Sequence, residues 1–108
     1  MKAFITGSRA YGTAMPTSDF DLVIQVSVED KAALEAEFGT TVRAGNLNLI
    51  CLTTEKEMMA WMLAKEECMT LARPFDGNRE GAVAIHEAWF RKLGLPARSA
   101  FGLSGEPR

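Results

Sequence analysis

Two aspartates separated by a single residue, Asp19 and Asp21, stand at the start of an apolar run in the stretch SDFDLVI. Because side chains alternate along an extended strand, both carboxylates are expected on the same face, about 7 Å apart along the chain. Carboxylate oxygens are preferred ligands of Mg²⁺, and a pair of divalent ions can lower the pKa of an attacking hydroxyl and neutralise charge on a phosphate. The spacing therefore predicts a metal site suited to phosphoryl or nucleotidyl transfer.

A turn that could hold phosphate comes earlier, where Gly7 and Ser8 follow the short apolar run KAFIT. Glycine lets the backbone approach an anion closely, and exposed backbone N–H groups with the serine hydroxyl can hold phosphate oxygens. Arg9 is placed to add a cation, while Tyr11 could contact a nucleotide or pack beneath the loop. Each feature alone is more often a plain turn or a solvated strand end, but the two together in this order are much more specific.

The elements that must position these residues follow from hydrophobic periodicity, capping patterns and turn residues. Ser27 and Thr54 each begin a helix-capping pattern, and Gly39 is a helix stop. Arg73-Pro74 and Asp76-Gly77-Asn78 are expected to break the helical pattern. Strands are expected over 2–6, 20–26 and 46–52, with a brief one at 40–43; a loop with at most one helical turn over 8–18; and helices over 28–38, 54–71 and 80–93.

This order predicts an α/β (α+β) fold, a small mixed β-sheet flanked by helices, in a single domain over residues 1–96. Residues 97–108 are expected to form a frayed tail. The chain is 47% hydrophobic and 24% charged, with a formal net charge of −2 and no run of like charge. That balance argues against a broad nucleic-acid surface, which needs clustered Lys and Arg.

No stretch approaches a signal peptide or a span of about 20 apolar residues, so a cytoplasmic protein without a membrane partner is expected. The two cysteines, Cys51 and Cys68, are far apart and have no metal-ligand spacing. We expect them to be buried free thiols in a reducing compartment rather than a disulfide.

The order GSRAYG, a short loop and SDFDLVI resembles the nucleotidyltransferase signature of the DNA polymerase β superfamily, in particular that of the minimal nucleotidyltransferases. The resemblance implies a fold in which Asp19 and Asp21 hold Mg²⁺ and are the catalytic carboxylates. A nucleoside monophosphate would pass from a nucleoside triphosphate, ATP among them, to a hydroxyl or similar acceptor with loss of pyrophosphate. The nucleotide-binding residues that it implies are Gly7, Ser8, Arg9, Gly12 and Ser18.

The sequence departs from this family where a third carboxylate usually stands on a neighbouring strand. The candidate strand, GNLNLICLT, offers only amides, with Asn48 as the first choice for that position and Asn46 as the second. An amide oxygen can ligate a metal weakly but supplies neither negative charge nor a base. Three explanations stay open: two carboxylates suffice; a distant acid fills the gap; or nucleotide and metal binding persist without catalysis. The candidate distant acids are Glu66, Glu67 and Asp76.

The sequence is therefore consistent with two functions. One is a Mg²⁺-dependent nucleotidyltransferase, and the other is a catalytically silent module that binds nucleotide, metal or a protein. The short chain predicts an acceptor bound in the groove, on the second copy of a homodimer, or on a separate helical partner chain. Trp89 and Phe90 point in different directions on one helix, which favours such a partner. The lone histidine, His86, is expected at the surface or capped. A methionine- and tryptophan-rich stripe is expected to be core: Met58, Met59, Trp61, Met62 and Met69.

Overall fold

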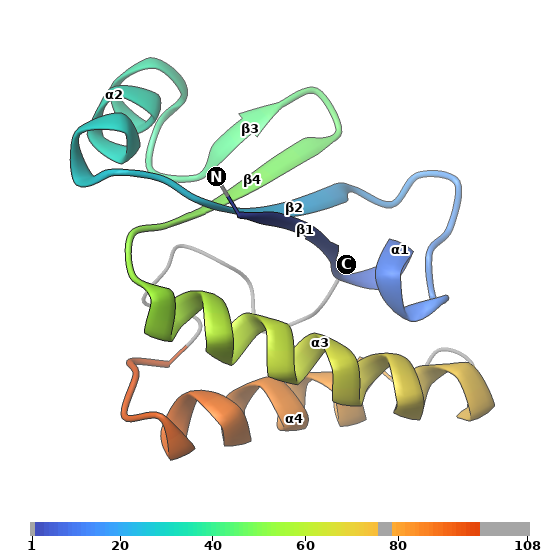
Figure 1. Cartoon of the computed structure of the whole chain (residues 1–108). Helices are drawn as coiled ribbons and strands as arrows, with labels where there is room; N and C mark the ends of the chain where they lie inside the picture. Colours follow the sequence, from blue (N-terminus) through green and yellow to red (C-terminus); the bar gives the residue numbers. More distant parts are fainter. Residues whose placement is uncertain (1, 76–78, 98–108) are drawn as a thin grey trace.

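A four-stranded mixed sheet forms the centre of the fold in the computed structural model, which describes residues 2–75 and 79–97 (Figure 1). Its strands lie in the order β1-β2-β4-β3. Strand β2 pairs antiparallel with β1 and parallel with β4, and β3 pairs antiparallel with β4. The predicted α/β (α+β) class with a mixed sheet is confirmed. The strands are β1 (Ala3–Thr6), β2 (Phe20–Gln25), β3 (Val42–Ala44) and β4 (Leu47–Leu52).

The helices cover the sheet unequally. The long helices α3 and α4 lie side by side beneath one face, while α2 lies on the other side and the single turn α1 follows the end of β1 (Figure 1). None of the helices in the described ranges is long and apolar enough to span a bilayer. The helices are α1 (Ser8–Tyr11), α2 (Val28–Phe38), α3 (Glu55–Phe75) and α4 (Arg79–Lys92).

Both predicted caps are present. The Ser27 hydroxyl accepts a hydrogen bond from the Asp30 backbone N–H at 3.0 Å, at the start of α2. Thr54 accepts from the Glu57 N–H at 3.2 Å and donates to the Glu57 carboxylate at 2.8 Å, before α3. These side chains satisfy backbone donors that the first helical turn leaves unpaired, so the helix starts could be read from local sequence.

The expected break at Arg73-Pro74 was wrong by a few residues, because α3 continues to Phe75. A proline has no N–H to donate to the carbonyl four residues earlier, and its ring clashes with that carbonyl. Both effects fall on the turn before the proline, so a residue after it can still be helical. The second expected break, at 76–78, lies outside the described residues. The predicted tail lies outside the described residues from position 98 onward, and the extent of the domain stays a prediction.

The core lies between the sheet and the helices α3 and α4. Alternation along β2 puts Asp21 on the same face as buried Val23, and alternation along β4 puts Asn48 on the same face as buried Ile50. The polar pair thus sits at one end of the helix-covered face. The predicted methionine stripe divides: Met58 is buried, whereas Met59 is 51% exposed. The buried cluster consists of Val23, Ile50, Leu52, Met58, Ala60, Trp61 and Phe90.

The two cysteines are free and buried, as predicted. Burial raises the pKa of the Cys51 thiol, with smaller opposing influences from Lys31, which lowers it, and Glu35, which raises it. The folded state therefore holds this proton to a higher pH than the unfolded chain does. The resulting stabilisation is complete below the ordinary thiol pKa of about 8.5 and is lost as pH rises through the folded value.

We accordingly expect the free energy of unfolding to fall more steeply with pH above about 8.5 in the wild type than in Cys51→Ala. Urea titrations between neutral and alkaline pH measure this difference. Parallel pH curves for the two proteins would contradict the raised pKa.

Candidate functional site

The pairing of the strands places four polar residues in one row across the sheet. Thr6 on β1 lies opposite Asp21 on β2, Asp21 lies beside Asn48 on β4, and Asn48 lies opposite Arg43 on β3. Asp19 precedes β2 at the same end of the sheet. Backbone pairing therefore brings together residues from all four strands.

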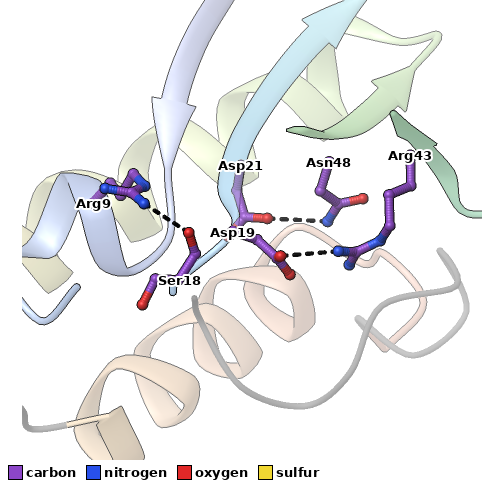
Figure 2. A network of polar contacts seen from close by, with 6 residues as sticks. All are labelled: Arg9, Ser18, Asp19, Asp21, Arg43 and Asn48. Atoms are coloured by element: carbon purple, nitrogen blue, oxygen red, sulfur yellow. Dashed lines mark hydrogen bonds and ion pairs between the residues drawn. The ribbon is translucent and has the colours of Figure 1, made fainter. Parts of the chain in front are cut away.

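The side chains at this end contact one another in two pairs, which Figure 2 shows with both carboxylates pointing toward β3 and β4. The Asn48 amide donates to Asp21 Oδ1 at 3.0 Å, and both residues are almost fully buried, at 4% and 3% exposed. The Arg43 guanidinium lies 2.9 Å from Asp19 Oδ1. The Asp19 side chain is 17% exposed and the Arg43 side chain 35%, so this pair is more accessible to solvent than the pair of Asp21 and Asn48.

The Gly7-Ser8 turn follows directly from Thr6, the first member of the row. Gly7 has φ 75°, a conformation in which glycine avoids the strain that a side chain would cause. Ser8 is fully buried, and its hydroxyl makes no hydrogen bond within the described part of the chain. A buried hydroxyl without a hydrogen-bond partner lowers the stability of the fold, unless a ligand supplies that partner.

Arg9 and Ser18 hold the loop between α1 and β2 together. Arg9 Nη2 donates to the Ser18 carbonyl at 2.7 Å (Figure 2), and the Ser18 hydroxyl accepts from the Met15 N–H at 2.8 Å. Gly12 ends α1 in the left-handed conformation, with φ 80°. These contacts fix the approach of the chain to Asp19.

Tyr11 packs beneath the loop, which was one of its two expected positions, and it is too deeply buried to stack on a nucleotide. Its hydroxyl bonds to Thr6 Oγ1 at 2.9 Å and to His86 Nε2 at 2.5 Å. His86 is fully buried and packs against Trp61, with ring centroids 5.0 Å apart and the two rings tilted by 60°. The expectation of a surface histidine was wrong, because the imidazole is buried and its Nε2 bonds to the Tyr11 hydroxyl, 75 residues away.

This network gives a stability prediction. Tyr11→Phe removes a hydroxyl that bonds two buried partners, and should lower the free energy of unfolding by about 1–3 kcal/mol. A double-mutant cycle with Thr6→Val, followed by urea denaturation, isolates the coupling between the two side chains. A loss below about 0.5 kcal/mol would show that the network is not a stabilising one.

The gap left by the missing third acid is filled by Asn48, since Asn46 lies exposed in the turn before β4. Glu66 and Glu67 are exposed on α3, and Asp76 lies outside the described residues. Among residues 2–75 and 79–97, no three His, Cys, Asp or Glu side chains gather closely enough to hold a metal ion. Within those ranges the acidic part of the site therefore consists of two carboxylates.

Arg43 is a site residue that sequence reasoning missed. A signal was present, because Gly45-Asn46 is typical of a two-residue hairpin turn, and pairing across it places Arg43 opposite Asn48. The prediction of a brief strand at 40–43 did not include that pairing.

The donors at this end of the sheet fit a hard divalent cation. Asp19 and Asp21 supply carboxylate oxygens, and the buried Oδ1 of Asn48 accepts no hydrogen bond from any residue that the structure describes. All three are oxygen donors of the kind that Mg²⁺ selects over softer ligands.

Comparison with known proteins gives one match. A family model described as a nucleotidyltransferase domain matches residues 1–73, which run from β1 through most of α3. No curated protein and no solved structure matches the chain. The matched range includes every residue of the polar row and of the Gly7-Ser8 turn.

Proposed function

The chain belongs to the nucleotidyltransferase domain family, and on that premise we propose that it is a Mg²⁺-dependent nucleotidyltransferase. In the proposed reaction a nucleoside monophosphate passes from a nucleoside triphosphate such as ATP to an acceptor nucleophile, and pyrophosphate leaves. The observation that carries the proposal is the convergence of Asp19, Asp21 and Asn48 at one end of the sheet, beside the Gly7-Ser8 turn.

Asp19 and Asp21 would hold the divalent ion, and the Asn48 carbonyl oxygen would join them after its amide group turned over and gave up the hydrogen bond to Asp21. When bound, the ion would neutralise charge on the phosphates and favour loss of the acceptor's proton. Asp21 is held in place by the amide of Asn48, so one ligand would be fixed before the ion arrives. Asn48 brings no charge and cannot act as a base, so the proton of the acceptor would pass to an aspartate or to water.

The Gly7-Ser8 turn would hold the phosphates. The Ser8 hydroxyl is buried and has no hydrogen-bond partner in the described part of the chain, and Gly7, which is also buried, has no side chain to separate its backbone from an anion. Arg9, Gly12 and Ser18 would contribute by shaping the loop that leads to Asp19, since Arg9 is already bonded to the Ser18 carbonyl.

A second candidate is a module that binds nucleotide or protein without catalysis. The neutral Asn48 and the ion pair of Asp19 with Arg43 favour it, because both reduce the negative charge that would hold metal. A homodimer or a separate helical chain stays a proposal for the partner, with half-buried Trp89 on α4 as one contact. Two buried free thiols suit a reducing compartment such as the cytoplasm.

Calorimetric titration of ATP, GTP, CTP and UTP, each with and without Mg²⁺, tests the binding that both candidates share. We expect Mg²⁺-dependent binding in the wild type and none in Asp19→Asn/Asp21→Asn. Formation of pyrophosphate in an acceptor screen then separates the enzyme from the silent module. Failure of the wild type to bind any nucleotide at millimolar concentration would overturn the proposal.

A further inference from the structure

Arg43 brings a permanent positive charge into the carboxylate site. Its guanidinium lies 2.9 Å from Asp19 Oδ1, on a carboxylate that a divalent ion would also use. The Arg43 side chain is 35% exposed, so part of it remains accessible to a ligand. The Arg43 guanidinium therefore already occupies a position beside Asp19 where a divalent ion would also bind.

The position of this cation is set by the backbone. Arg43 pairs with Asn48 across the hairpin of β3 and β4, and the hairpin turns at Gly45, which has φ 62°. Asn48 in turn pairs with Asp21. The register therefore fixes Arg43 as the last member of the row, whatever its side chain contacts.

From the charges in this row we infer that the site takes one divalent ion, and that Arg43 is its second cation and binds the triphosphate. The inference rests on the proposed function. Before a triphosphate binds, two carboxylates and one guanidinium carry a single net negative charge, which one divalent ion converts to a single positive charge. A second divalent ion would add two more positive charges at short range and would meet the guanidinium as a competitor for Asp19.

In this arrangement the ion pair of Arg43 with Asp19 depends on a neutral residue at position 48. A carboxylate at position 48 would face both Asp21 and Arg43 across the sheet, and would draw the guanidinium away from Asp19. The neutral amide leaves Arg43 on Asp19 while still donating to Asp21. When a metal ion takes Asp19, a triphosphate supplies the guanidinium with a new anionic partner, and guanidinium is well suited to bind phosphate by paired hydrogen bonds.

The first test counts ions. Titrating Mn²⁺ into equimolar protein and α,β-methylene-ATP, both far above the dissociation constant of their complex, with free Mn²⁺ followed by electron paramagnetic resonance, should give one ion per complex in the wild type. Asn48→Asp alone should still give one, because Arg43 neutralises the new carboxylate. Asn48→Asp/Arg43→Met should give two. Two ions in the wild type would overturn the inference.

The second test measures affinity. In Arg43→Met, the apoprotein should bind Mn²⁺ more tightly, because a competing cation is gone, and should bind Mg²⁺–α,β-methylene-ATP about tenfold more weakly. Arg43→Lys should restore part of the nucleotide affinity. Arg91→Met, the same change on the exposed surface of α4, should alter neither quantity. Thermal unfolding of each variant confirms that it is folded.

These outcomes distinguish a failure of the inferred role of Arg43 from a failure of the proposed nucleotidyltransferase function. Unchanged nucleotide affinity in Arg43→Met, with binding still lost in Asp19→Asn/Asp21→Asn, overturns the role of Arg43 and leaves the proposed function standing. Absence of Mg²⁺-dependent nucleotide binding in the wild type overturns both.

Discussion

Asp21→Asn is expected to lower nucleotidyl transfer by at least about a hundredfold while leaving the fold intact. Asp21 is 3% exposed and bonded to the Asn48 amide. Asparagine has the same shape, and its carbonyl oxygen can still accept that hydrogen bond. What it removes is the negative charge on which the proposed cation site depends.

The same substitution is expected to leave stability unharmed although it removes activity. Burying a carboxylate costs solvation free energy, so the neutral side chain should leave the free energy of unfolding unchanged within about 1 kcal/mol, or raise it. Asp30→Asn, an exposed aspartate on α2, changes net charge equally and should retain full activity. Retained activity in Asp21→Asn, or its unfolding, would contradict this account of the residue. Urea denaturation and the transfer assay measure the two effects.

Trp61→Ala is expected to cost about 3–5 kcal/mol of stability, more than Tyr11→Phe or any change at the polar row. The indole is almost fully buried, packs edge-on against Phe90 with centroids 5.5 Å apart, and lies against His86. Its removal opens a cavity between α3, α4 and the sheet. Small domains have a total stability of about 5–15 kcal/mol, so this variant should lose a large share of its free energy of unfolding.

Trp89→Ala is the matched control, because this second tryptophan is half-buried on α4 and its ring contacts Lys92. It should cost much less than Trp61→Ala. Trp61→Phe keeps part of the packing and should give a folded protein of intermediate stability. Far-ultraviolet circular dichroism during urea titration follows all three variants. Equal costs at the two tryptophans would contradict the placement of the core.

The parts of the fold that depend on local sequence could be predicted. The start of α2 follows from the Ser27 cap and its end from Gly39, and the apolar run before Gln25 predicted β2. The Asp-x-Asp spacing and the Gly7-Ser8 turn located the candidate site, because the chemistry of metal and phosphate limits which residue types can serve.

The parts that depend on packing could not be predicted in the same way. The burial of His86 depends on Tyr11, 75 residues earlier, and the exposure of Met59 depends on which side of α3 meets the sheet. Arg43 reaches the site through two strand pairings in succession. A single sequence indicates such contacts only when the register of every strand is already known.

The central claim is that Asp19 and Asp21 hold a divalent ion and, with it, a nucleoside triphosphate. Nuclear magnetic resonance of the labelled 108-residue chain tests it without knowledge of the acceptor. Substoichiometric Mn²⁺ should broaden the amide signals around Asp19, Asp21 and Asn48 before all others. With Mg²⁺ in place of Mn²⁺, addition of α,β-methylene-ATP should shift the amide signal of Ser8, and Asp19→Asn/Asp21→Asn should abolish both the broadening and this shift. Broadening centred on another part of the chain, or unchanged in that variant, would contradict the claim.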